Sequence, residues 1–166
     1  TNKNDVTKWI KSNNFDSIIH LAAIVPTVKV NQDKKYAYKV NFEGTKNIID
    51  AINSFSNKKI WFFFGSTSHV YKLGTKKKNE KHKPVPQNYY GNTKLLSEKY
   101  ILKNRNLYTP CIGRIFSFTH KTHSIDYLIP SLYKKIFLTK KKKLIFENLN
   151  HYRDFLHTSD ICSAIT

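Results

Sequence analysis

The sequence predicts an α/β fold with a doubly wound parallel sheet. Three short runs, residues 17–23, 59–66 and 111–116, are mostly apolar, as the strands of a buried parallel sheet are. Segments with apolar residues at helical spacing alternate with these runs. Because this alternation is typical of parallel sheets, we expect helices to cover both faces of the sheet.

The helices are predicted from the same periodicity and from signals at their ends. They are expected at residues 5–13, 41–55, 89–104 and 127–137. Asn41 is a residue type that caps helix N-termini, and Pro130 fits the first turn of the last helix. The pattern becomes less regular after residue 126. We therefore expect one domain over residues 1–126 and a smaller lobe that begins within residues 127–166.

The composition excludes several classes of protein. No apolar run approaches the roughly 18 residues of a membrane span, and no basic start precedes an apolar stretch as in a secretory signal. Cys111 and Cys162 are too few for a disulfide framework and lie among apolar residues, so we expect them in the core. These features fit a cytoplasmic protein with no membrane partner. Since the chain starts at Thr1 and contains no Met, we expect a piece of a longer protein, cut at both ends.

The charge is strongly basic, with 29 Lys and Arg residues against 11 Asp and Glu residues and a net charge of +18. Such a balance is typical of proteins that bind nucleic acid or another polyanion. The lysines gather at residues 76–83 and 140–143, which form either solvated loops or a rim that attracts anions. Because aromatic residues do not interleave with the basic ones, we expect no nucleic-acid partner. His20, His69 and His157 lack the spacing of metal ligands, so we expect no metal.

Tyr90 and Lys94 form a candidate pair for proton transfer. Residues four apart share one face of a helix, so the two side chains would project together. A neighbouring ammonium lowers the pKa of a phenol from about 10, which suits alcohol–ketone chemistry. A hydroxyl from Thr67, Ser66 or Ser68, at the end of a preceding strand, would hold the reacting oxygen. In a chain rich in lysine and tyrosine, this spacing also arises by coincidence.

The order of motifs around this pair is more specific. The chain carries, in sequence, "IIHLAA", "NFEGTKNIIDA", "FGSTSHVY", "EKHKPVPQNYYGNTKLLSEKY" and "RDFLHTSDICSAI". This order resembles the extended short-chain dehydrogenase/reductase family, the NAD-dependent epimerase/dehydratases that act on nucleotide sugars. The resemblance implies a partial Rossmann-type domain over residues 1–126 and the start of a substrate-binding lobe over residues 127–166. It also implies NAD or NADP as cofactor, a nucleotide-sugar substrate and a homodimer when the protein is full length.

The resemblance also implies roles for individual residues. Tyr90 is expected to be the catalytic acid/base and Lys94 its pKa-lowering, ribose-binding partner. Thr67 is expected to position the substrate. The remaining expected contacts are with the cofactor, through Ala22, Ala23, Asn41 and Ser66, and with the substrate, through Ser68 and Arg153.

The sequence departs from the family pattern in two informative places. The glycine-rich G-x-x-G-x-x-G turn that holds the pyrophosphate is absent, so we expect at least one βαβ unit before Thr1 and no family-type cofactor binding by this piece alone. Ser68 and His69 stand where sugar 4,6-dehydratases place an Asp-Glu pair, which favours epimerisation or ketone reduction over dehydration. A dehydratase with other acids and a catalytically silent relative remain alternatives. Arg114 is either a structural ion-pair partner or part of the substrate wall.

Overall fold

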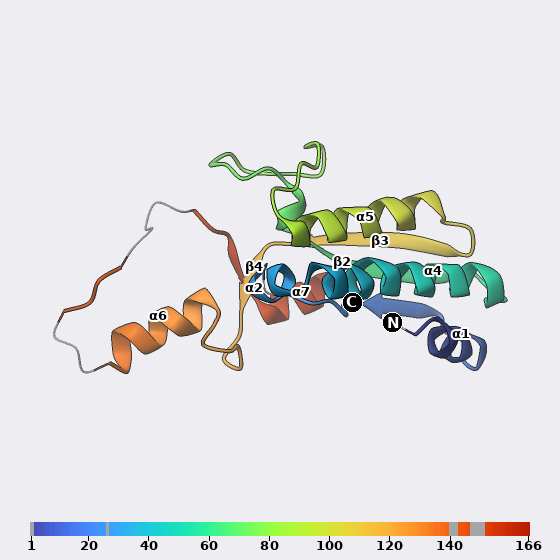
Figure 1. Ribbon diagram of the computed structural model, residues 1–166, viewed down its shortest axis with the longest axis horizontal. Coiled ribbons are helices and arrows are strands. Elements are labelled where there is room, and N and C mark those ends of the chain that lie inside the picture. The colour runs from blue at the N-terminus through green and yellow to red at the C-terminus, as the bar shows by residue number, and fades with distance from the viewer. Residues whose placement is uncertain (1, 26, 140–142, 147–151) are drawn as a thin grey trace. The chain divides into compact units, whose positions relative to one another are not determined.

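The computed structural model describes residues 2–25, 27–139, 143–146 and 152–166. The chain forms two compact units, Thr1–Ile115 and Phe116–Thr166 (Figure 1). The first contains α1 (Lys3–Lys11), β1 (Ser17–His20), α2 (Thr27–Gln32), α3 (Lys34–Tyr38), the π-helical segment η1 (Lys39–Glu43), α4 (Gly44–Phe55), β2 (Ile60–Thr67), the 3₁₀ turn η2 (Ser68–Val70), α5 (Tyr89–Lys103) and β3 (Tyr108–Ile115). The second contains β4 (Ser117–Thr119), α6 (Leu128–Phe137), β5 (Phe155–His157) and α7 (Thr158–Ile165).

The sheet of the first unit is parallel, in the order β1-β2-β3. The register pairs Ile18 with Phe62 and Phe62 with Pro110. The predicted parallel α/β fold is therefore confirmed. The third strand begins at Tyr108, earlier than predicted, and it tolerates Pro110 because alternate N–H groups of an edge strand make no ladder hydrogen bond.

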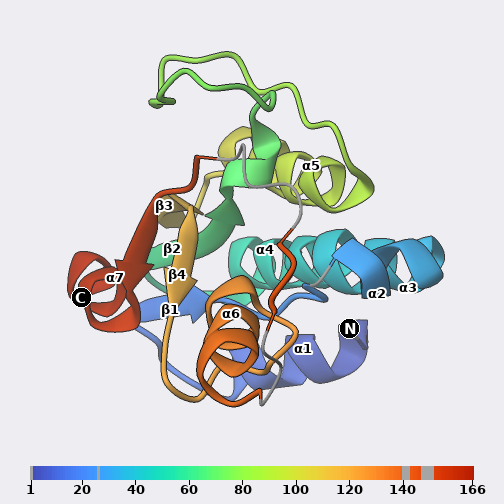
Figure 2. The same ribbon diagram turned by 90° about the vertical axis from the view of Figure 1, so that its left-hand side faces the viewer.

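The core lies between one face of this sheet and three helices. Alternate residues of β2, namely Ile60, Phe62 and Phe64, point into it and are almost completely buried. Figure 2 shows α1, α4 and α5 on the same side of the three strands, so these helices do not cover both faces of the sheet as expected. These helices fill the core with Ile10, Ile49, Ile52 and Ile101. The helical spacing of apolar residues thus buries one stripe of each helix against the sheet.

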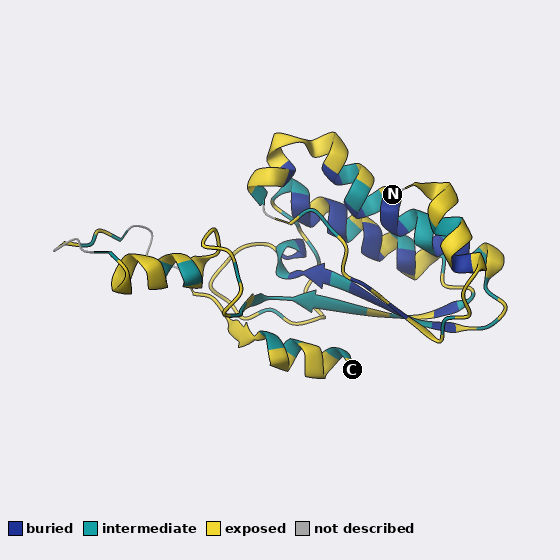
Figure 3. Ribbon diagram, turned by 90° about the horizontal axis from the view of Figure 1, so that it is seen from below, coloured by how far each residue is buried: buried dark blue, intermediate teal, exposed yellow. Residues whose placement is uncertain are grey.

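The opposite face of the sheet is only partly covered in the part of the chain that the structure describes, where Phe63 of β2 is buried but both neighbouring strands have exposed side chains. Ile19 of β1 is 46% exposed, and Cys111 of β3 is also exposed. Figure 3 shows the contrast between the buried inner stripes of the helices and the exposed surfaces of the unit. The prediction of core cysteines was wrong for Cys111, which alternates onto this partly covered face, and for Cys162, which is exposed on α7.

The prediction that Asn41 caps a helix was also wrong. The helical segment begins earlier, at Lys34, where the carboxylate of Asp33 accepts the N–H of Tyr36 at 2.8 Å. It then passes through η1 into α4 without a break in the helical backbone. Asn41 lies inside the π-helical segment and is buried. Its side chain is therefore available for contacts with other elements.

The second unit contains a separate parallel pair, β4 and β5, in which Phe118 aligns with Leu156. His157 and Asp160 form a reciprocal cap at the start of α7, and the Thr158 hydroxyl donates to the Thr119 carbonyl at 3.1 Å. The structural boundary after Ile115 falls earlier than residue 126 because β4 pairs with the late strand β5. Among the helices of the described residues, none is long and apolar enough to cross a membrane.

Candidate functional site

The site is built where the carboxyl end of β2 meets the start of α5. Parallel sheets bind ligands at the carboxyl ends of their strands, so this is the expected edge. Thr67 ends β2 and is buried, and its Oγ1 accepts the N–H of His69 at 3.3 Å. Gly91 allows α5 to approach this turn, because a Cβ at that position would lie 2.2 Å from the carbonyl oxygen of His69. The turn and the helix are therefore in direct backbone contact.

One face of α5 carries three buried polar side chains at successive four-residue steps. Tyr90 is 7% exposed, Lys94 is 1% exposed and Glu98 is 2% exposed. Residues at this spacing lie one above another along a helix. The structure thus confirms that Tyr90 and Lys94 belong to one helix and turn inward together. It adds Glu98, which the sequence had indicated only as part of a motif.

Lys94 carries a buried amino group. Its Nζ lies 3.9 Å from the centroid of the Phe64 ring, and none of the hydrogen bonds between described residues begins at this ammonium. Burial lowers the pKa of Lys94 to about 7, and the nearby Glu98 carboxylate acts in the opposite direction. Burial and, secondarily, the charge of Lys94 lower the pKa of His20 to about 4. His20 is therefore neutral at pH 7, and its Nε2 lies 3.0 Å from Thr45 Oγ1.

An ion pair between the buried Glu98 and the partly exposed Arg114 lies one turn further along α5. Arg114 of β3 binds both carboxylate oxygens of Glu98, with Nη2 at 2.7 Å from Oε2. The remaining guanidinium nitrogen, Nη1, donates to the Tyr71 hydroxyl at 2.8 Å. The hydroxyl of Ser66 also donates to Glu98. Of the two roles left open for Arg114, the geometry supports the structural ion pair.

Asn41 ties the segment after β1 to α5. Its Oδ1 accepts the Ile24 N–H at 2.7 Å, and its Nδ2 lies 3.2 Å from the Ile24 carbonyl and 3.3 Å from Thr93 Oγ1. The backbone carbonyl of Asn41 accepts the hydroxyls of Thr45 and Ser97 at 2.8 and 2.9 Å. π-Helical turns are frequent at functional sites. One residue thus fixes the position of the loop that follows the first strand.

Tyr90 has an apolar side and a polar side. Its ring packs in a small buried cluster with Val30 and Ala37. On the other side, the His69 ring lies 5.6 Å away at 72°, an edge-to-face arrangement. Asn88, the residue that caps α5, has its Nδ2 2.7 Å from His69 Nδ1. The phenol is therefore held between a packed helix and a hydrogen-bonded imidazole.

The structure brings most of the predicted site residues into the first unit. Tyr90, Lys94, Ser66, Thr67 and Asn41 are buried around the junction of β2 and α5, and Ser68 opens η2. Ala22 and Ala23 follow β1, next to the Ile24 that Asn41 holds. Arg153 is exposed in the second unit, just before β5. The contacts expected of these residues with cofactor and substrate stay predictions.

Sequence reasoning missed Asn88 and gave Glu98 no role. An Asn that follows Pro86 and precedes a helical pattern is a capping signal, so Asn88 could have been found. Its contact with His69 depends on the tertiary approach of two elements and has no local signal. Glu98 lies four residues after Lys94, which indicates a shared face. Its pairing with Arg114 is again a tertiary contact.

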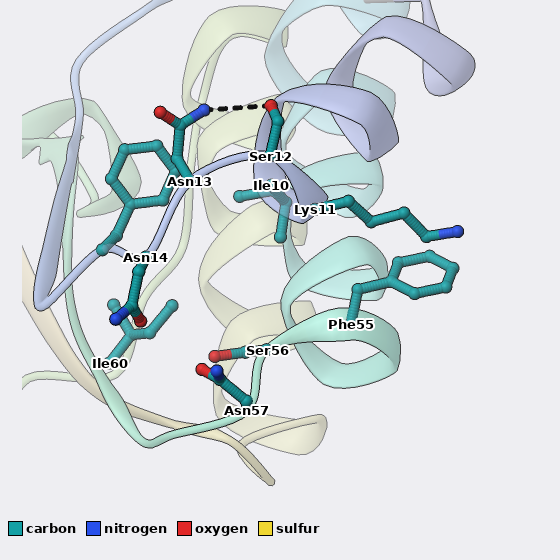
Figure 4. Close-up of a pocket in the computed structure, with 10 residues that line it drawn as sticks. Ile10, Lys11, Ser12, Asn13, Asn14, Phe55, Ser56, Asn57 and Ile60 are labelled. Carbon is teal, nitrogen blue, oxygen red and sulfur yellow. Dashed lines mark hydrogen bonds between the residues drawn. The ribbon is translucent and has the colours of Figure 1, made fainter.

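A pocket of about 190 Å³ lies at the other end of β2, beside Ile60 (Figure 4). It is formed by the C-terminal ends of α1 and α4, and Ser12 and Asn13 form a 3.2 Å hydrogen bond on its wall. None of the predicted site residues lines it. No group of three or more His, Cys, Asp or Glu side chains within the described ranges is arranged to hold a metal ion.

Known proteins resemble this chain over its whole length. The chain is 30% identical over 166 residues to GDP-6-deoxy-D-talose 4-dehydrogenase of Aggregatibacter actinomycetemcomitans, covering 99% of this chain and 55% of that protein. It is 28% identical to ADP-L-glycero-D-manno-heptose-6-epimerase of Brachyspira hyodysenteriae, over 96% of this chain and 51% of that protein. The chain thus spans about half the length of the curated relatives that it matches.

A solved structure shares the fold. UDP-glucuronic acid 4-epimerase from Bacillus cereus, in complex with UDP-glucuronic acid and NAD, superposes with a TM-score of 0.78 at 26% identity. The match covers 95% of this chain and 49% of that one. The family model of the NAD-dependent epimerase/dehydratase family matches residues 1–166. The protein therefore belongs to the NAD-dependent epimerase/dehydratase family.

Proposed function

We propose that the complete protein is an NAD(P)-dependent epimerase or reductase of a nucleotide-activated sugar, with Tyr90 as its acid/base. The observation that carries this proposal is the buried alignment of Tyr90 and Lys94 on one face of α5, beside the end of β2. Relatives named as a 4-dehydrogenase and as epimerases of nucleotide sugars support the substrate class. The strand end supplies Thr67 at the same edge.

The proposed chemistry is the interconversion of a sugar alcohol and a ketone. The nicotinamide supplies or accepts the hydride when the cofactor is bound. Tyr90 takes the hydroxyl proton in the oxidising direction and returns it in the reducing direction. Thr67 holds the same oxygen by a hydrogen bond. When Lys94 is protonated, its positive charge favours the phenolate form of Tyr90 and so matches the phenol to this proton transfer.

Lys94, Ala22 and Ala23 are suited to bind the nicotinamide half of a dinucleotide cofactor. The Lys94 ammonium is buried beside an aromatic ring, and a ribose hydroxyl would give it the acceptor that the hydrogen bonds between described residues do not supply. The small side chains of Ala22 and Ala23 would let a cofactor approach the backbone of the loop held by Asn41. The glycine-rich turn that holds a pyrophosphate in this family is not among the chain's residues.

Epimerisation or reduction is favoured over dehydration by Ser68 and His69. Elimination of water from a sugar needs one group to protonate the leaving hydroxyl and another to remove a carbon-bound proton. Neither side chain is a carboxyl group. Product analysis separates the alternatives, because a 4,6-dehydratase yields a 4-keto-6-deoxy sugar and an epimerase yields the stereoisomer of its substrate.

The assignment of Tyr90 is tested with Tyr90→Phe in the complete protein. We expect kcat to fall by about 10²-fold or more, because the general acid/base is removed, while NADH binding, followed by fluorescence, is retained. Tyr89→Phe is the matched control, since it removes a neighbouring hydroxyl from the same helix. Retained turnover in Tyr90→Phe would refute the assignment. Binding of NADH by the unaltered protein, with no turnover of any nucleotide sugar, would instead support the silent relative.

The proposal also includes a homodimer located in the cytoplasm. The family resemblance supports the homodimer, and the composition of the chain supports the location. Sedimentation velocity of the complete protein measures the oligomeric state directly, and a monomer would contradict this part of the proposal.

A further inference from the structure

The residue pair Asn88 and His69 adds a second polar group to the site. His69 lies in η2, two residues after the strand end, and Asn88 precedes α5. The two side chains meet with 2.7 Å between Asn88 Nδ2 and His69 Nδ1. The His69 ring is also the polar neighbour of the Tyr90 ring. The contacts of Asn88 and His69 are separate from the burial of Tyr90 and Lys94 on which the proposed function is based.

The orientation of the Asn88 amide is fixed by the helix that it caps. The backbone N–H of Gly91 lies 2.7 Å from one atom of this amide. A backbone N–H can only donate, so that atom must be the amide oxygen. The NH₂ group must therefore be the part that faces His69. The usual ambiguity between the oxygen and nitrogen of an Asn side chain does not arise here.

The fixed amide determines the tautomer of His69. An NH₂ group only donates, so Nδ1 of His69 must accept and carries no proton. The ring is then neutral, with its proton on Nε2. A doubly protonated imidazolium would bring two donors together at 2.7 Å. Asn88 thus selects a neutral imidazole that donates from Nε2, as hydrogen bonds at one ring nitrogen do for the other.

We propose that His69 donates a hydrogen bond from Nε2 to a sugar oxygen beside the oxygen served by Tyr90, and that Asn88 is the positioning residue that fixes this donor. The proposal rests on the function proposed above and names a further substrate contact within the same site. A neutral donor polarises a carbonyl and holds a hydroxyl without exchanging a proton. His69 therefore acts by hydrogen bonding alone.

Substitutions at His69 separate a donor from a general base in the complete protein. His69→Gln places an amide NH₂ near the position of Nε2–H, and we expect it to keep kcat within about tenfold of the unaltered protein. His69→Ala removes the donor, and we expect kcat to fall by about 10²-fold. Equal losses in His69→Gln and His69→Ala would overturn the proposal, as would unchanged turnover in His69→Ala.

Substitution at Asn88 tests the positioning role through pH. Asn88→Asp keeps a good capping residue but presents an acceptor to Nδ1, so the ring takes a proton there. The imidazolium still donates from Nε2 at low pH. When it loses a proton at higher pH, Nδ1 keeps its hydrogen and Nε2 becomes bare. We expect the ratio of kcat in Asn88→Asp to kcat in the unaltered protein to fall as pH rises.

Asn92→Asp is the matched control for Asn88→Asp. Asn92→Asp adds the same charge to an exposed position of α5, and its kcat ratio should not depend on pH in this way. The Tyr90 ring, which lies beside the His69 ring, also titrates and is common to all these variants. A ratio that is constant or rises with pH in Asn88→Asp would overturn the positioning role.

Nitrogen-15 spectra of the imidazole provide a readout that does not need turnover. Long-range proton–nitrogen correlations in protein labelled with ¹⁵N-histidine distinguish the tautomers, and His69→Gln assigns the signal. We expect a neutral ring with its hydrogen on Nε2, and a hydrogen on Nδ1 would refute the inference. If Tyr90→Phe keeps full turnover, the proposed function fails whatever the His69 spectrum shows. If only the His69 experiments fail, the proposed function stands.

Discussion

Replacement of the buried Lys94 by Met should make the protein more stable and inactive. The pKa of Lys94 falls from 10.5 to about 7 because burial disfavours the charged form. At about 1.4 kcal/mol for each tenfold change in proton affinity, this fall corresponds to about 5 kcal/mol of unfavourable free energy at low pH. Met fills a similar volume and has no charge to bury. Glu98 keeps its partner in this variant, because Arg114 holds both of its carboxylate oxygens.

The sign of the pH dependence follows from the protons bound in each state. Between pH 7 and 10.5 the unfolded chain keeps a proton on Lys94 that the folded protein has released. The free energy of unfolding therefore rises with pH in this window. Lys94→Met lacks this dependence. The increase in the free energy of unfolding that Lys94→Met brings should be largest at and below pH 7, at about 2–5 kcal/mol, and should shrink toward pH 10.5.

Urea unfolding of the complete protein at pH 6.5 and pH 10 measures both effects. Lys99→Met is the matched control, since it removes the same charge from the exposed side of the same helix. We expect the control to change the free energy of unfolding by less than about 0.5 kcal/mol at either pH. A Lys94→Met protein that is less stable than the unaltered one at pH 6.5, or whose difference is the same at both pH values, would show that the reasoning from burial is wrong.

Three further substitutions test separate contacts. Gly91→Ala should destabilise by about 1–3 kcal/mol in thermal unfolding, although helix propensity alone predicts a gain of about 1 kcal/mol, because its Cβ would meet the His69 carbonyl. Arg114→Gln should cost about 3 kcal/mol in urea unfolding because Glu98 would be left buried without a cation, and a loss under 1 kcal/mol would contradict this. The neutral His20 should make stability fall as pH drops from 6.5 toward 4, since only the unfolded chain then binds a proton. His20→Asn should reduce this slope, which melting temperatures at pH 7 and pH 5 measure.

Whether a segment forms a helix or a strand was predictable because it depends on the local pattern of apolar residues. The apolar run of β2 and the helical spacing of α4 and α5 are readable in the sequence, and the structure places these elements within a few residues of the predicted bounds. The exposure of Cys111 was not readable. A run of apolar residues predicts a strand but does not say which of its faces is covered.

The site was predictable in its sequence-local part only. Tyr90 and Lys94 share a face because four residues make about one helical turn, and this needs no knowledge of the fold. Asn41 was assigned to the wrong local role, because its position inside a π-helical segment depends on contacts with Ile24 and Ser97 that lie far away in the sequence. Such contacts form only when the chain has folded.

Lys94 and Glu98 are both buried ionisable groups of α5, but among the described residues only Glu98 has a partner of opposite charge bound to it. Glu98 and Arg114 satisfy each other, so their pair is explained by the fold itself. Lys94 is different, because it is as deeply buried and yet has an aromatic ring rather than a described hydrogen-bond acceptor beside its ammonium. Stability alone would favour an apolar side chain at this position. A hydroxyl-bearing ligand that accepts from Lys94 would offset the cost, which is why stabilisation and loss of turnover should appear together in the one variant that removes this amine.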